Sequence, residues 1–220
     1  FDNGEEWIGL YTTDPFSDPS APAAAENLSI SYATPGATTA RISCDLPTKT
    51  AGGNELKGLV NVAIVVDGDT VQIKENQSPG AEFSISLALT NGLHVLKVIC
   101  LNSGGEGVAA SIKTFTGEDM PQIPTEVTAV AEESGKVTLS WTLPEAGING
   151  GWVNLTKVSY DILRNGESLS TDIKETTYID NLPENELKSY KYTVIVKFGG
   201  EECGSVESNS VVFGKAVSLP

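Results

Sequence analysis

The chain has 220 residues, of which 29 are acidic and 14 basic, so its formal net charge is −15 at pH 7. A charge of this sign is repelled by phosphate backbones and anionic membrane surfaces, which argues against nucleic acid as a partner. No apolar run reaches the roughly 18 residues that a membrane-spanning helix needs, and 22 glycines and 11 prolines indicate a chain rich in turns.

The first predicted element is a lead-in segment over residues 1–21. It contains the apolar stretch "WIGLYTTDPF" and ends in the Pro- and Ser-rich "SDPSAP". So apolar a segment is unlike a free tail, and we expect part of it to pack on the first domain or to end a preceding one. The N-terminus lacks the basic and apolar stretches of a signal peptide and begins with Phe. We therefore expect a processed or truncated fragment.

Residues 22–117 are predicted to form a first domain whose pattern returns in residues 118–215. The segments "RISCDLPTKTAGGN" (41–54) and "TLSWTLPEAGINGG" (138–151) share a Ser, a Leu-Pro pair and a Gly-Gly pair at similar spacing. Two copies of about 98 residues are too long for solenoid repeats and have the length of a β-sandwich domain. The predicted fold class is all-β, with two tandem antiparallel β-sandwich domains.

Within the first copy, "NGLHVLKVIC" alternates with period two, which places four residues on one core-facing side of a strand: His94, Leu96, Val98 and Cys100. Asp67-Gly68 predicts a hairpin turn, and it lacks the continuation of an EF-hand calcium loop. The single histidine of the chain has no neighbours at zinc-ligand spacing. We expect no metal, no cofactor and no catalytic residue.

Residues 117–124, "GEDMPQIP", are predicted to form a stiff connector because prolines favour extended backbone. The second copy then shows three alternating strands, "GKVTLSW", "KVSYDIL" and "SYKYTVIVKF". Asn165-Gly166 supplies the two positive-φ positions of a type I′ hairpin turn. The inward residues are Val137, Leu139, Trp141, Val158, Tyr160, Ile162, Tyr190, Tyr192, Val194 and Val196.

Residues 121–214 resemble a fibronectin type III domain. "IPTEVTAV" corresponds to strand A, "VTLSW" to strand B, "VSYDI" to strand C and "TTYIDNLPENELKSYKYTVIV" to strands E and F. The resemblance implies that Trp141 is the strand-B core tryptophan and that Tyr160 lies in the core. It also implies that Leu182 and Tyr190 form a tyrosine corner, whose hydroxyl bonds nearby backbone. All of these roles are structural.

The first copy departs from this pattern, since Cys44 stands where the second copy has Trp141. Its "LTNGLHVLKVICLNSGGEG" resembles the "G-x-H-x-L-x-V" strand of bacterial immunoglobulin-like domains. Residues 22–117 are therefore predicted to be an immunoglobulin-like or divergent type III sandwich.

By this resemblance, Cys44 and Cys100 lie on strands B and F of opposite sheets, and a disulfide between them is one prediction. In immunoglobulins the strand-F cysteine follows the tyrosine-corner position by two residues, whereas Cys100 follows His94 by six. Four extra residues displace Cys100 by about 13 Å, at about 3.3 Å per residue. Two unpaired core thiols are the favoured alternative. Cys203, in a polar loop, is expected to be exposed, and three cysteines cannot all pair internally.

Exposed aromatic rings are the candidate ligand contacts, because the faces of sugars stack on flat rings. Trp152 follows a Gly-Gly pair, and Trp7 and Tyr11 lie in the lead-in. The favoured alternative for Trp152 is packing over the end of its own sandwich or onto the adjacent domain.

The final "FGKAVSLP", with a linker starting at residues 216–220, resembles the lead-in to anchoring or adhesin-type domains of Bacteroidetes surface proteins. We therefore expect a non-enzymatic spacer and interaction scaffold within a larger exported or surface bacterial protein, located outside the cell or on its surface. Its expected partners are neighbouring domains of a longer chain and an extracellular glycan or protein. The alternatives are a glycan- or protein-binding adhesin module and an accessory region of a secreted hydrolase.

Overall fold

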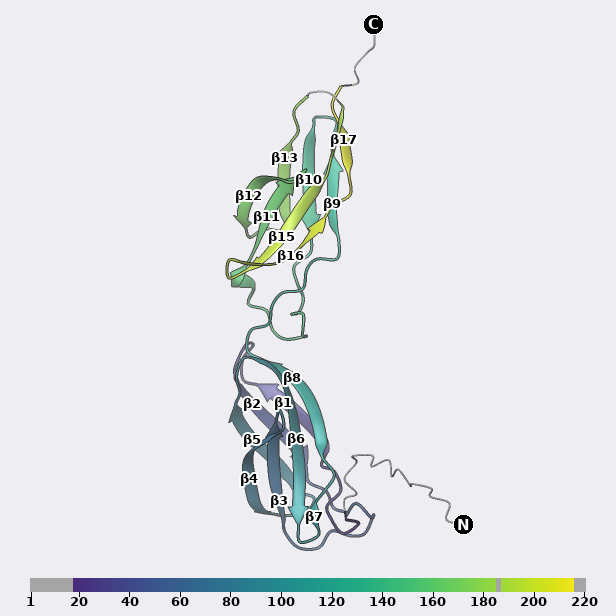
Figure 1. Cartoon of the computed structure of the whole chain (residues 1–220), viewed down its shortest axis with the longest axis vertical. Coiled ribbons are helices and arrows are strands. Elements are labelled where there is room, and N and C mark those ends of the chain that lie inside the picture. Colours follow the sequence, from purple (N-terminus) through teal and green to yellow (C-terminus); the bar gives the residue numbers. More distant parts are fainter. Residues whose placement is uncertain (1–17, 185–186, 216–220) are drawn as a thin grey trace, which may run out of the picture. The chain divides into compact units, whose positions relative to one another are not determined.

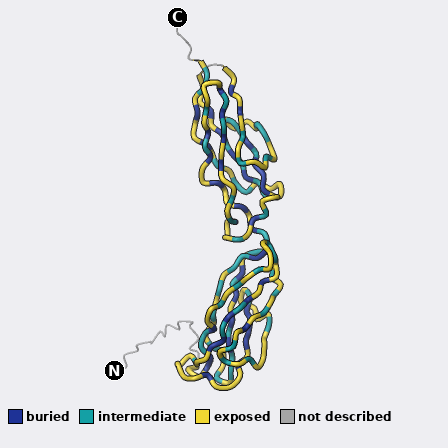
Figure 2. The backbone as a smooth tube through the Cα atoms, turned by 180° about the vertical axis from the view of Figure 1, so that it is seen from behind, coloured by how far each residue is buried: buried dark blue, intermediate teal, exposed yellow. Residues whose placement is uncertain are grey.

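The computed structural model describes residues 18–184 and 187–215. Its elements are antiparallel strands, together with one 3₁₀ turn, η1, at Leu155–Lys157 (Figure 1). Buried and exposed residues alternate along the strands (Figure 2), as expected of sheets with one face on a core. The predicted all-β fold class with two tandem β-sandwiches is confirmed. In the described residues, no helix is long and apolar enough to cross a membrane.

The first sandwich consists of two sheets. One has the strand order β1-β2-β5, formed by Glu26–Tyr32, Thr39–Asp45 and Glu82–Ala88. The other has the order β4-β3-β6-β7, formed by Asp69–Gln77, Val60–Val66, Gly92–Asn102 and Gly105–Glu106, with β8 (Ala110–Thr116) also pairing with β6.

The core of the first sandwich is mainly aliphatic. The predicted inward face of β6 is confirmed, because all four of its residues are buried, His94 among them. His94 Nε2 lies 2.9 Å from the Thr90 carbonyl oxygen, so a polar ring is accommodated at the edge of the core. The predicted turn between β3 and β4 is also confirmed, since Asp67 and Gly68 have φ values of 54° and 101°.

The second sandwich has a three-stranded sheet in the order β13-β10-β9. Its strands are Thr177–Asn181, Lys136–Trp141 and Val127–Ala131. The facing sheet has the order β12-β11-β15-β16, from Glu167–Ile173, Val158–Arg164, Tyr192–Phe198 and Glu201–Glu207. Two short strands, β14 (Lys188–Tyr190) and β17 (Val211–Phe213), pair with each other. The segments matched to strands A, B and E thus share one sheet, and those matched to C and F share the other.

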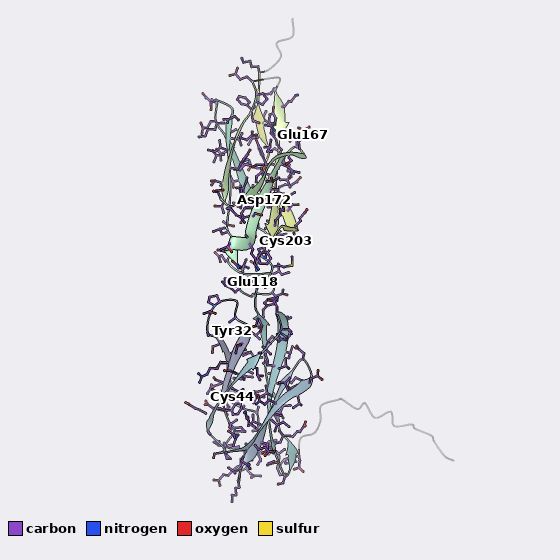
Figure 3. The ribbon with its side chains drawn as sticks, turned by 90° about the vertical axis from the view of Figure 1, so that its left-hand side faces the viewer. Tyr32, Cys44, Glu118, Glu167, Asp172 and Cys203 are labelled. Carbon is purple, nitrogen blue, oxygen red and sulfur yellow. The ribbon has the colours of Figure 1, made fainter. Side chains whose placement is uncertain are left out.

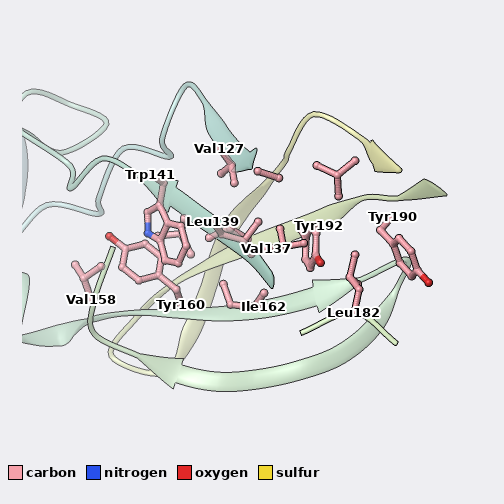
Figure 4. Packing of buried hydrophobic residues seen from close by; sticks show 14 of the residues in the cluster. Val127, Val137, Leu139, Trp141, Val158, Tyr160, Ile162, Leu182, Tyr190 and Tyr192 are labelled. Carbon is pink, nitrogen blue, oxygen red and sulfur yellow. The ribbon is translucent and has the colours of Figure 1, made fainter. Parts of the chain in front are cut away.

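Aromatic residues fill the core of the second sandwich (Figure 4). The rings of Trp141 and Tyr160 meet edge to face, with their centroids 5.2 Å apart. The predicted type I′ turn is confirmed by φ values of 49° at Asn165 and 85° at Gly166. Every inward residue predicted for β10, β11 and the strands β14 and β15 is buried.

Near one end of this core, a carboxylate joins the two sheets. Asp180 on β13 accepts hydrogen bonds from the Tyr192 hydroxyl at 2.7 Å and from Arg164 Nη1 at 2.9 Å. Burial of the phenol, followed by the nearby Asp180, raises the pKa of Tyr192. Leu182 and Tyr190 are buried beside this group, with the Arg164 guanidinium 5.8 Å from the centroid of the Tyr190 ring. The predicted bond from the Tyr190 hydroxyl to backbone stays a prediction.

A side chain closes the outer edge of β9. Asn209 Oδ1 accepts a hydrogen bond from the Ala129 N–H at 2.8 Å, and Asn209 Nδ2 donates to the Ala129 carbonyl at 2.9 Å. The amide therefore pairs with the strand as a neighbouring strand would, which protects this edge from pairing with another chain.

The sheets take their strands from residues 26–116 or from residues 127–213. By internal contacts the chain divides into two compact units, one of residues 1–30, 42–85 and 95–113 and the other of the remaining residues. This division cuts through strands of the first sandwich. The boundaries 22–117 and 118–215 therefore stay a prediction, and each sandwich is described by itself.

Candidate interaction surface at the 145–152 loop

Of the three aromatic residues predicted as ligand contacts, Trp7 and Tyr11 lie outside the described residues. Trp152 lies at the end of the loop of residues 145–152, which follows β10, and it is 40% exposed. The structure of this loop decides whether Trp152 has a defined position.

A buried carboxylate organises the loop. Asp119, in the connector, is 1% exposed. Its two oxygens accept hydrogen bonds from the backbone N–H groups of Met120, Asn149 and Gly151 and from Asn149 Nδ2, at 2.8 to 3.0 Å. The Asp119 N–H in turn donates to the Trp152 carbonyl at 2.8 Å. The connector is thereby hydrogen-bonded to the loop at the Gly151 N–H and at the Trp152 carbonyl.

Two glycines make this close approach possible. A Cβ at Gly147 would lie 2.2 Å from the Asp119 carboxylate, and one at Gly151 would lie 2.9 Å from the Asp119 Cβ. Contacts this short force a neighbour to move, so any other residue at Gly147 would displace the carboxylate from its donors. Gly147 and Gly151 of "AGINGG" therefore have a packing role in this loop.

The electrostatics of the connector favour ionised acids. Burial opposes ionisation of Asp119, but the hydrogen bonds from Asn149, Gly151 and Met120 outweigh it and hold the Asp119 pKa below its ordinary value. Glu118 (Figure 3) accepts hydrogen bonds from Lys157 Nζ and Asn154 Nδ2, and these partners lower its pKa. Two neighbouring acids thus attach the connector to the second sandwich.

Three apolar side chains are exposed on the anchored segments. Met120 is 44%, Ile148 59% and Trp152 40% exposed, and the Ile148 N–H donates to the Met120 carbonyl at 2.9 Å. We call Met120, Ile148 and Trp152 the 145–152 surface, after the loop that supplies two of them. Its backbone is held by Asp119, and part of the Trp152 ring lies against Gly36, where a Cβ would be 2.4 Å from Trp152 Cε3. The exposed remainder of the ring and the two aliphatic groups suit apolar contact.

An open depression in the first sandwich is lined by Thr48, Glu55, Leu56, Lys57, Gly58 and Pro79. Within residues 18–184 and 187–215, no group of three or more His, Cys, Asp or Glu side chains is arranged to hold a metal ion.

The two cysteines of the first sandwich are buried free thiols. Cys44 on β2 and Cys100 on β6 are 5% and 1% exposed. Burial, with the nearby Asp45, raises the pKa of Cys44 to about 11. Burial, with the nearby Cys44, raises the pKa of Cys100 to about 12. Both are therefore protonated and weakly nucleophilic at neutral pH. The expectation that Cys203 is exposed in a loop is wrong, because it lies on strand β16 as a partly exposed free thiol. The structure records no bond between Cys44 and Cys100.

No protein-family model matches the chain, and no curated protein matches it. Among solved structures, the chain is similar to the FN1–FN3 domains of chicken CNTN1, at 13% identity over 88% of this chain and 68% of that chain, with a TM-score of 0.33. It is also similar to the central fibronectin-III array of RIM-binding protein, at 14% identity over 94% of this chain and 73% of that chain, with a TM-score of 0.32. The chain's own sheets show the two-sandwich fold.

Proposed function

We propose that the two sandwiches act as a non-enzymatic spacer and interaction scaffold within a larger exported or surface bacterial protein. The supporting observation is the anchoring of the connector. Strand β8 ends at Thr116, and Asp119 is already bound to the 145–152 loop. Only Gly117 and Glu118 stand between them, and Glu118 is itself held by Lys157 and Asn154. We infer that a connector this short and this well attached to the second sandwich has few freely rotating bonds, which is what a spacer requires.

Loss of the Asp119 carboxylate is expected to loosen the connector. Spin labels placed at Glu82→Cys on β5 and Glu167→Cys on β12, in a Cys203→Ser background, report the distance between the sandwiches by double electron–electron resonance. We expect a single narrow distance distribution, which Asp119→Ala broadens at least about twofold, because the backbone N–H groups of Asn149 and Gly151 lose their acceptor.

The matched control is Glu145→Ala, which removes an exposed acid from the same loop and should leave the distribution unchanged. Because the Asp119 pKa is held below its ordinary value, the anchor is complete above about pH 4 and is lost as the pH falls through the folded-state pKa. A distribution that is already broad at pH 7, or one that Asp119→Ala leaves unchanged, would contradict the spacer proposal.

The 145–152 surface favours a second candidate function, a binding module for a glycan or a protein. We expect that a ligand found by screening glycan and protein arrays would lose at least about fivefold in affinity on Trp152→Ala, because a stacked ring contributes about 1 kcal/mol or more. The measurement is isothermal titration calorimetry against wild type and against Leu155→Ala, a nearby residue that is 45% exposed and outside the surface. A ligand whose affinity falls equally with both variants, or with neither, would not use this surface.

A further inference from the structure

The outer face of one sheet in the first sandwich is apolar. Strand β3 reads "VNVAIVV", and Val60, Val62 and Ile64 point into the core. Ala63 and Val65 lie on the opposite face, yet they are only 6% and 7% exposed. Strands that are apolar on both faces are typical of sheets covered on both sides.

The register of the sheet shows which residues surround them. Ala63 pairs with Ile73 on β4 and with Ile99 on β6, and Val65 pairs with Lys97 on β6. Residues paired across antiparallel strands share a face, so these side chains form one surface. Ile73 is 53% exposed, so the described residues do not cover the β4 side of this surface. We call the following residues the outer patch: Ala63, Val65, Ile73, Lys97 and Ile99.

The equivalent face of the second sandwich has a different character. There, Lys197 Nζ on β15 lies 3.2 Å from Asp161 Oδ2 on β11 and 3.6 Å from Asp172 Oδ1 on β12. Charged side chains that form ion pairs and contact water are stable on an exposed sheet face, so this face does not require burial by another segment. The outer patch has one cation, Lys97, among aliphatic side chains, so its chemistry fits an apolar partner that carries negative charge.

The described chain begins close to this patch. The carbonyl oxygen of Ser20 accepts a hydrogen bond from Asn102 Nδ2 at 2.9 Å. Asn102 is the last residue of β6 and lies three residues beyond Ile99. Residues 1–17 therefore join the sandwich at one end of the strand that supplies Lys97 and Ile99.

The composition of residues 1–17 complements the patch. The segment holds four acidic residues and no Lys or Arg, and its apolar residues include Trp7, Tyr11 and Phe16. An extended chain of about 3.3 Å per residue covers about 20 Å over the six residues from Tyr11 to Ser17. The five residues of β6 from Lys97 to Asn102 span about 17 Å on the same measure. The aromatic residues can thus reach the patch without strain.

We propose that residues 7–16 dock on the outer patch, with aromatic rings over Ile73 and Ile99 and with Asp14, the one acidic residue of this stretch, near Lys97. This docking is independent of the proposed spacer and scaffold function, which rests on the second sandwich and its connector. It covers an apolar sheet face that is otherwise available to another protein chain.

The test uses the full chain labelled with 5-fluorotryptophan, whose three tryptophans give three ¹⁹F resonances. Replacing each tryptophan with Phe assigns them, and the shift between H₂O and D₂O reports exposure to solvent. We expect Trp7 to be shielded from solvent in the wild type. Ile73→Lys should expose it by placing a desolvated charge under the ring, and Lys97→Glu should weaken the docking by repelling the acidic segment.

The matched control is Ile179→Lys, which places the same charge at an isoleucine that is 54% exposed on the second sandwich. It should leave the Trp7 resonance unchanged, and unchanged Trp141 resonances would show that all variants are folded. A Trp7 resonance that is solvent-exposed in the wild type would overturn the proposal. So would shielding that appears only with concentration-dependent dimers in sedimentation experiments, because the patch would then bind a second copy.

Discussion

Trp141→Ala is expected to destabilise the second sandwich by about 3 to 5 kcal/mol, the usual cost of removing a buried aromatic side chain. Trp141 is 6% exposed and meets Tyr160, which is fully buried, edge to face. Its loss leaves a cavity beside Leu139 and Tyr160 that close-packed β-strands cannot refill. Chemical denaturation monitored by circular dichroism measures the loss as a lower transition midpoint at unchanged slope.

Trp152→Ala is the matched control for this prediction, because it removes the same side chain from a site that is 40% exposed. We expect it to cost about 1 kcal/mol or less. Equal losses for the two variants would mean that Trp141 does not fill the core as described. A second check is Trp141→Phe, which should recover part of the stability because it restores most of the apolar volume.

Asp180→Ala is expected to cost about 2 to 4 kcal/mol, since it leaves two donors without their acceptor. The Tyr192 hydroxyl is buried and donates to Asp180, while Arg164 is partly exposed and can turn to water. Most of the loss should therefore come from the phenol. Tyr192→Phe, combined with Asp180→Ala, should recover part of the stability in a double-mutant cycle.

The exposed ion pair between Lys191 and Glu207 provides the contrast. Both side chains are about half exposed, so Glu207→Ala should change the stability by about 0.5 kcal/mol or less. Thermal unfolding of Asp180→Ala, Tyr192→Phe, the double variant and Glu207→Ala distinguishes the buried interaction from the exposed ion pair. If Asp180→Ala were as mild as Glu207→Ala, water would have to replace Asp180 as the acceptor of the buried phenol.

Local patterns in the sequence predicted the strands and turns correctly. The alternation in "GKVTLSW" and "NGLHVLKVIC" identified residues that are buried on β10 and β6. Asn165-Gly166 and Asp67-Gly68 identified two hairpin turns with positive φ. These predictions succeed because side-chain alternation and positive-φ preference are properties of residues adjacent in the chain.

The residues that organise the candidate site could not be predicted from local patterns in the sequence. Asp119 was expected only as part of a stiff acidic connector, yet it is buried and accepts hydrogen bonds from residues 30 and 32 positions away. Asn209 closes the edge of β9 from 80 residues away. The only local sign of this site was the glycine-rich "AGINGG". Its backbone N–H groups are free to donate hydrogen bonds, but the segment does not show which residue accepts them.

The amino-acid sequence by itself thus determined the fold class, the repeat of two sandwiches and the faces that Trp141 and Cys44 occupy, because each depends on short-range periodicity. The tertiary structure alone decided that Asp119 holds the 145–152 loop, that Asp180 bridges two sheets and that Ala63 and Ile73 share an outer sheet face. Each of these depends on which distant strands become neighbours. The type of each residue determines whether its side chain must be buried or hydrogen-bonded. Which distant residue it contacts depends on how the strands pack.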